Sequence, residues 1–70
     1  MAKVLKTGEI KPFVRNWLEN HPEISDWYDI EEIINPLVQD CKKAAQRIDG
    51  DGNVVCYQYE IEEYLDRLNW

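Results

Sequence analysis

The sequence offers few side chains that could act as a nucleophile or as a general base. Thr7, His21 and Ser25 are its only threonine, histidine and serine, and they lie far apart along the chain. Nucleophilic catalysis needs a nucleophile within hydrogen-bond reach of a base, and phosphate chemistry needs a glycine-rich loop, which is absent here. The sequence therefore predicts a protein that is not an enzyme and that binds no cofactor.

The sequence contains two cysteines, Cys41 and Cys56. Each stands where a small apolar side chain would suit a core, so two buried free thiols are expected in a reducing compartment. The alternative is a single disulfide that closes the loop between them. His21 has no neighbouring cysteine or histidine at zinc-ligand spacing, and we expect it to lie exposed beside the end of a helix.

An acidic segment near the C-terminus has the spacing of calcium ligands. From Asp49 to Glu60 it resembles the EF-hand loop, and this resemblance implies a calcium site made of Asp49, Asp51, Asn53 and Glu60. Where that loop has a glycine for its sharp turn, this chain has Val54, a β-branched residue that disfavours positive φ. The expectation is an acidic turn without metal, and calcium binding is a second alternative function.

Two adjacent aromatic residues, Trp27 and Tyr28, lie within a strongly acidic stretch. Residues 19–40 hold seven acidic residues and no lysine or arginine. An exposed aromatic ring is a typical interface anchor, and surrounding acids favour a partner with a basic surface. The alternative is that one ring fills the core. The predicted partner-binding residues are Glu23, Asp26, Trp27, Tyr28, Asp29, Glu31 and Glu32.

The basic residues Lys42, Lys43 and Arg47 form a cluster that could contact nucleic acid. Lysine and arginine near the C-terminal end of a helix also offset the helix dipole, which is the simpler explanation of their position.

Two helices account for the first two thirds of the chain. Apolar residues with helical spacing predict a helix over residues 10–20, with Pro12 in its first turn and His21-Pro22 at its end. A longer apolar stripe runs from Ile30 to Ile48 and predicts a helix over 29–47, capped by Asp29. Because the stripe continues past Pro36, we expect one helix kinked there rather than two separate helices.

The last third combines β-favouring and helical patterns. The run VVCYQY predicts a strand over residues 54–59, paired with residues 3–6, with residues 46–48 across a turn, or with both. A final helix is expected over 60–69, and Trp70 either folds back onto the core or is exposed. The fold class is therefore α+β and mostly helical, in one domain that spans residues 1–70.

The C-terminal third resembles the wing and closing helix of excisionase-type winged-helix proteins of mobile elements. The resemblance rests on GNVVCY at 52–57 followed by EIEEYL at 60–65. It implies that the helix carrying Lys42, Lys43 and Arg47 reads a DNA groove and that residues 49–53 form the wing. The resulting alternative function is a small DNA-binding regulator.

Composition and charge favour a protein partner over a nucleic acid. The 70 residues carry a net charge of −6 and 44% hydrophobic side chains, and no apolar run is long enough to span a bilayer. Affinity for nucleic acid depends on neutralising phosphates, and this chain has few basic groups for it. The sequence thus predicts a cytoplasmic interaction module, an adaptor or inhibitor that binds a basic protein such as one that handles nucleic acid. Its oligomeric state stays open.

Overall fold

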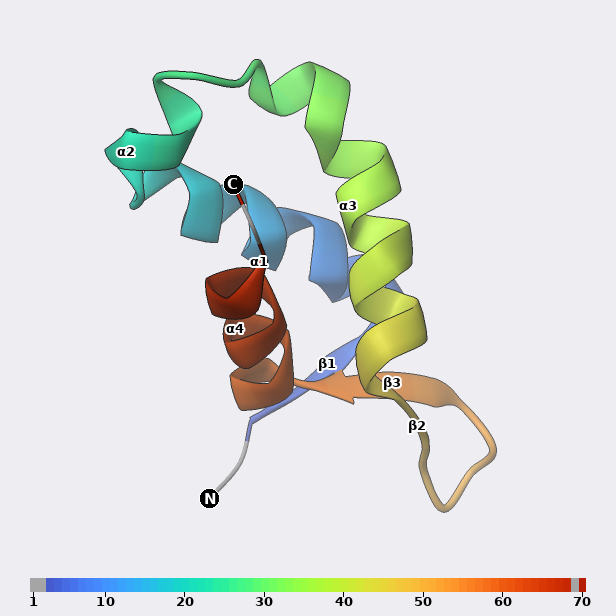
Figure 1. Ribbon diagram of the computed structural model, residues 1–70. Helices are drawn as coiled ribbons and strands as arrows, with labels where there is room; N and C mark the ends of the chain where they lie inside the picture. Colours follow the sequence, from blue (N-terminus) through green and yellow to red (C-terminus); the bar gives the residue numbers. More distant parts are fainter. Residues whose placement is uncertain (1–2, 69) are drawn as a thin grey trace.

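A computed structural model describes residues 3–68 and 70 of the chain (Figure 1). It is a mostly helical α+β fold in which the helices lie on one side of a small antiparallel sheet. The elements in chain order are β1 (Val4–Lys6), α1 (Thr7–Glu19), α2 (Pro22–Ser25), α3 (Ile30–Ala45), β2 (Gln46–Ile48), β3 (Val54–Tyr57) and α4 (Gln58–Arg67).

The sheet has the strand order β1-β3-β2, so the β-favouring segment is its central strand. β3 pairs antiparallel with both neighbours, and Cys56 lies opposite Leu5 on one side and Gln46 on the other. The expected pairings with residues 3–6 and with 46–48 are therefore both present. Leu5 and Cys56 are buried and contribute to the core under the helices.

The core is built from the apolar stripes that the sequence shows. In α1 the buried residues Ile10, Val14, Trp17 and Leu18 follow the predicted helical spacing. The other buried core residues are Leu5, Ile24, Ile34, Leu37, Val38, Cys41, Ala45, Cys56, Ile61 and Leu65. Burial of this apolar surface supplies the main driving force for folding.

The first helix begins earlier than predicted. It starts at Thr7, with Lys6 as its N-cap residue. The Glu9 carboxylate accepts a hydrogen bond of 2.9 Å from the backbone N–H of Lys6 and so stabilises the N-terminus of the helix. Pro12 consequently lies inside the helix and not in its first turn. Pro12 has no N–H to donate to the Gly8 carbonyl. Gly8 and Pro12 are both exposed, so water can donate to that carbonyl instead.

The connection after α1 contains the short helix α2, which was not predicted. Pro22 occupies its first turn, where the missing N–H is harmless, and Ile24 is its buried residue. The His21-Pro22 step ends α1 as expected, and the same proline begins the new turn.

The long helix α3 is continuous through Pro36, and Figure 1 shows its axis bending in the N-terminal half. This agrees with the prediction of one kinked helix. The helix ends at Ala45, two residues before the predicted end, because residues 46–48 pair with β3. Ile48, the last residue of the apolar stripe, therefore lies on an edge strand and is 62% exposed.

The final helix α4 follows β3 without a turn and begins at Gln58, two residues before the predicted start, so the strand predicted over 54–59 ends at Tyr57. The Gln58 N–H donates to the Lys3 carbonyl at 2.9 Å. Of the predicted helix over 60–69, Asn69 lies outside the described residues. Among the described residues, no helix is both long and apolar enough to cross a bilayer.

Candidate functional site

The short helix α2 determines how Trp27 is presented. Ile24 anchors α2 in the core, and a continued helix would have placed Trp27, three residues later, on the same buried face. The helix ends at Ser25, and the N–H groups of Trp27 and Tyr28 both donate to the Ile24 carbonyl, at 3.0 and 3.1 Å. This tight turn fixes the backbone of Trp27 while directing its side chain away from the core.

Trp27 and Tyr28 differ in their surroundings. Trp27 is 83% exposed, whereas Tyr28 is 39% exposed and donates a hydrogen bond of 2.8 Å from its hydroxyl to the Trp70 carbonyl. Neither ring belongs to the buried core. A tryptophan side chain is rarely this exposed in a folded protein, and an interface anchor has to be exposed before its partner binds.

Trp70 folds back onto the molecule and forms part of a shallow pocket. The pocket has a volume of about 330 Å³ and is lined by Glu23, Trp27, Tyr28 and Trp70, which we call the aromatic pocket. The indole N–H of Trp70 donates to the Leu65 carbonyl at 3.0 Å. Two segments 42 residues apart in sequence, at Tyr28 and Trp70, thus form one wall.

His21 supports this end of the molecule by packing on Trp17. The two rings stack with centroids 3.8 Å apart, and His21 Nδ1 lies 2.6 Å from the Trp17 carbonyl oxygen. A carbonyl only accepts, so Nδ1 carries the proton. His21 is half-buried because its ring stacks on that of Trp17, four residues earlier, and this contradicts the expectation of an exposed side chain.

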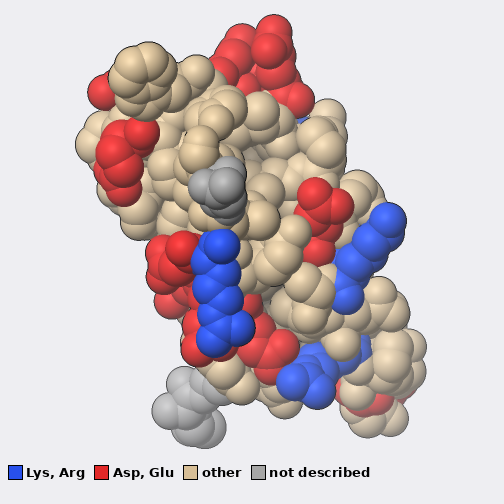
Figure 2. Space-filling model, viewed as in Figure 1, with Lys and Arg blue, Asp and Glu red and all other residues tan. Residues whose placement is uncertain are grey.

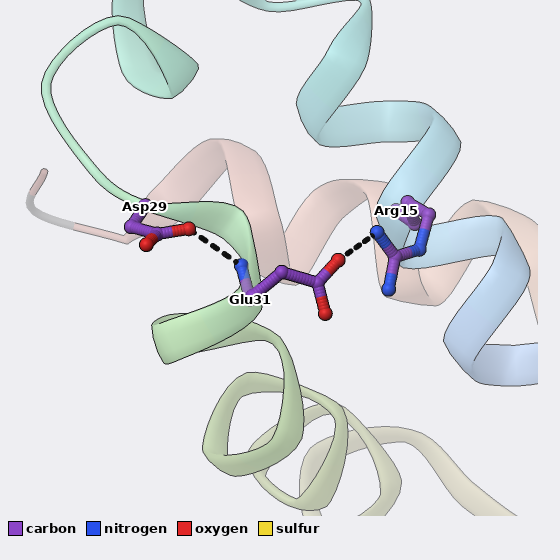
Figure 3. Close-up of polar contacts among 3 residues, drawn as sticks. All are labelled: Arg15, Asp29 and Glu31. Atoms are coloured by element: carbon purple, nitrogen blue, oxygen red, sulfur yellow. Dashed lines mark hydrogen bonds and ion pairs between the residues drawn. The ribbon is translucent and has the colours of Figure 1, made fainter.

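Two of the predicted partner-binding acids have partners within the chain (Figure 3). The Asp29 carboxylate caps α3 by accepting from the Glu31 N–H at 3.1 Å, as predicted. Glu31 in turn pairs with Arg15 of α1. The hydrogen bond and charge of Arg15 hold the pKa of Glu31 below its ordinary value, and the same contact raises the pKa of Arg15.

Replacing Glu31 by glutamine should destabilise the protein slightly at neutral pH and not at low pH. The pairing lowers the folded-state pKa of Glu31, so its contribution is complete above the ordinary value of 4.5 and is lost as pH falls through the folded-state pKa. Exposed pairs contribute little, so we expect a decrease of only a few degrees in melting temperature at pH 7. The difference in melting temperature between wild type and Glu31→Gln should shrink as pH falls below 4.5. A difference that stays constant or grows as pH falls would contradict the linkage, and Glu62→Gln serves as the control.

Glu23, Asp26 and Glu32 form no ion pair within the part of the chain that the structure describes. All three are exposed. In Figure 2, acidic side chains lie at the top and upper left of the molecule, where Figure 1 places α2 and the start of α3, and further acidic side chains lie lower, beside the lysine and arginine side chains visible on this face. We call Glu23, Asp26, Trp27, Tyr28, Asp29, Glu31 and Glu32 the acidic aromatic surface.

The predicted basic cluster is divided between two elements. Lys42 and Lys43 lie in the last turn of α3, where cations offset the helix dipole, and Arg47 lies on β2. Arg47 pairs with Glu60 at 2.8 Å, and the hydrogen bond and charge of Glu60 raise the pKa of Arg47. The end of α3 at Ala45 therefore separates Arg47 from the helical face on which the sequence placed it.

The calcium-ligand candidates are not brought together. The Asp49 carboxylate accepts hydrogen bonds from the N–H groups of Asp51 and Asn53, at 2.9 and 2.8 Å, and so closes the β2–β3 turn. Glu60 faces Arg47 instead. Gly52 takes the positive φ of the turn, and Val54 begins a strand. No cluster of three or more His, Cys, Asp or Glu with metal-binding geometry occurs among residues 3–68 and 70.

Cys41 and Cys56 are buried free thiols, as the first expectation held. Burial, with the neighbouring Cys56 as a smaller cause, raises the pKa of Cys41 to about 12. Burial also raises the pKa of Cys56. Both thiols are protonated near neutral pH, which makes them packing residues and not nucleophiles.

Two residues next to the acidic aromatic surface, Arg15 and Trp70, were not among the predicted partner-binding residues. Arg15 is the counter-charge of Glu31 although the two are 16 residues apart, and no local pattern indicates that pairing. The side chain of Trp70 was left open between core and surface, and it forms part of the pocket wall. The sequence feature that indicated this position was an aromatic residue that does not share the helical spacing of the apolar residues in the last helix.

Comparison with known proteins gave no match: no family model, no curated protein and no solved structure is significantly similar to this chain.

Proposed function

We propose that this chain is a non-enzymatic protein-binding module that engages a basic partner through the acidic aromatic surface. The observation that carries the proposal is the 83% exposure of Trp27 on a backbone held in place by α2. Large aromatic side chains that are exposed before binding supply much of the affinity of protein interfaces. Folding has already fixed the backbone that carries this ring, so binding has to order only the side chain of Trp27.

The charge around Trp27 supports a basic partner. Glu23, Asp26 and Glu32 are exposed and have no ion pair among the described residues, so their field is not neutralised locally. Complementary charge accelerates association and selects against acidic surfaces. Proteins that bind nucleic acid carry basic surfaces, and a module of this kind would act as an adaptor or an inhibitor of one of them.

The proposal is tested by affinity capture from the native host, with wild-type protein and Trp27→Ala as parallel baits. The expected partner is a basic protein retained by wild type and not by the variant. With that partner purified, the double variant Asp26→Lys, Glu32→Lys should lower the association rate constant about tenfold at low salt and less at high salt.

The matched control is Glu62→Lys with Asp66→Lys, two exposed acids of α4 that make the same change in net charge. It should have a much smaller effect on the association rate. Equal effects of the two double variants would show that net charge alone matters, and the acidic aromatic surface would lose its role.

A small DNA-binding regulator is the second candidate, favoured by the β2–β3 hairpin that directly follows α3. In it Lys42 and Lys43 would approach the DNA. Against it, the turn carries Asp49 and Asp51, and Arg47 is paired with Glu60. Titration with random duplex DNA at low salt separates the candidates. We expect no binding below about 100 µM, whereas micromolar, steeply salt-dependent binding would favour the regulator.

A further inference from the structure

The aromatic pocket has rigid walls on one side and a free ring on the other. Tyr28 and Trp70 meet edge to face, with centroids 5.9 Å apart and planes at 62°, and the Tyr28 hydroxyl is bonded to Trp70. The ring of Trp70 also stacks on that of Trp17, with centroids 6.1 Å apart, and its indole N–H donates a hydrogen bond to the Leu65 carbonyl. Trp27 has no such bond from its side chain among the described residues and is 83% exposed. The pocket is thus largely formed before any ligand binds.

The chemistry of the lining selects a cation. Three of its four residues present aromatic rings, and the fourth, Glu23, has no ion-pair partner among the described residues. A cation is attracted to the faces of indole and phenol rings and to a carboxylate. An anion would be repelled by Glu23, and an apolar group would remove that carboxylate from water without a partner.

We propose that the aromatic pocket receives an arginine side chain of the basic partner; the inference rests on the function proposed above and names the group recognised. A guanidinium is planar, so it stacks on an aromatic face and at the same time donates two parallel hydrogen bonds to a carboxylate. The compact and strongly hydrated ammonium of lysine has no flat face to stack. Glu23 beside three rings therefore favours arginine over lysine.

The probe is the peptide acetyl-Gly-Arg-Gly-Arg-Gly-amide, compared with its lysine and citrulline counterparts at 150 mM salt. Binding is followed by NMR of the tryptophan indole N–H signals of Trp17, Trp27 and Trp70. We expect the arginine peptide to shift the Trp27 and Trp70 signals and to bind at least about fivefold more tightly than the lysine peptide. The uncharged citrulline peptide should not saturate.

Two variants of equal charge locate the site. Glu23→Gln should weaken binding of the arginine peptide about tenfold, and Glu62→Gln on α4, which makes the same change in net charge, should weaken it less than about twofold. Both residues are exposed, so both variants should keep the wild-type melting temperature within a few degrees. Equal affinity for arginine and lysine peptides, or an unchanged affinity of Glu23→Gln, would overturn the proposal.

Failure of this inference is distinguishable from failure of the proposed function. If the arginine peptide does not bind but Trp27→Ala still weakens the captured partner, the pocket does not read arginine and the acidic aromatic surface remains the interface. If Trp27→Ala leaves the affinity for that partner unchanged, both proposals are wrong.

Discussion

Replacing Ile34 by aspartate should unfold the protein at room temperature. Ile34 is fully buried on the core face of α3, among the largest side chains of the core. Loss of a buried aliphatic side chain costs about 2 to 5 kcal/mol, and a buried carboxylate without a partner adds several more. A chain of this length has a total stability of about 4 to 10 kcal/mol, so the substitution removes most or all of it.

The measurement is the far-UV circular dichroism melt, with urea unfolding as a second probe. Gln39→Asp is the matched control, because Gln39 lies on the same helix and is exposed. It should lower the free energy of unfolding by less than about 1 kcal/mol. If Ile34→Asp and Gln39→Asp melted cooperatively at the same temperature, the assignment of the buried face of α3 would be wrong.

Replacing Trp27 by alanine should have the opposite pattern, a large effect on binding and almost none on folding. The exposed ring makes little contact with the core, so the free energy of unfolding should change by no more than about 0.5 kcal/mol. Affinity for the basic partner should fall by at least about 2 kcal/mol, roughly 30-fold, because an interface anchor loses its whole contact area. Isothermal titration calorimetry and thermal melts measure the two quantities.

Trp17→Ala is the matched control, since it makes the same substitution at a ring that is only 8% exposed. It should cost about 3 to 5 kcal/mol of stability through the cavity that it leaves in the core. Tyr28→Ala is less informative because it also removes the hydrogen bond to Trp70. If Trp27→Ala lowered stability and left affinity unchanged, Trp27 would be a packing residue and the acidic charges alone would remain in support of the interface.

The sequence by itself determined the elements whose signals are local. Apolar residues three and four apart define the buried faces of α1 and α3, and the Asp29 cap marks where α3 begins. The continuous stripe past Pro36 correctly predicted one bent helix. The run VVCYQY at 54–59 predicted a strand, because valine and tyrosine side chains suit a pleated sheet, and its residues 54–57 form β3. These signals depend on neighbours within about one helical turn, so the linear chain already contains them.

The end of α3 shows where local periodicity fails. Ile48 and Arg47 continue the helical phase, but pairing with β3 extends the backbone after Ala45 and moves both residues onto an edge strand. The residues that pair in β2 and β3 are six to ten residues apart across the turn, and this pairing outweighs the weak helical preference of the last residues of the stripe. The basic cluster was predicted from that phase, and it is divided for the same reason.

Only the tertiary structure decided which charges and rings are free to bind. Packing of α1 against α3 brings Arg15 to Glu31, and packing of α4 against the sheet brings Glu60 to Arg47, so these groups are paired. The burial of Ile24 and the end of α2 at Ser25 leave Trp27 exposed, while the return of Trp70 places it against Tyr28. Exposure and pairing depend on contacts between residues distant in sequence. The composition of the acidic aromatic surface could therefore be predicted from the sequence, but the aromatic pocket could not.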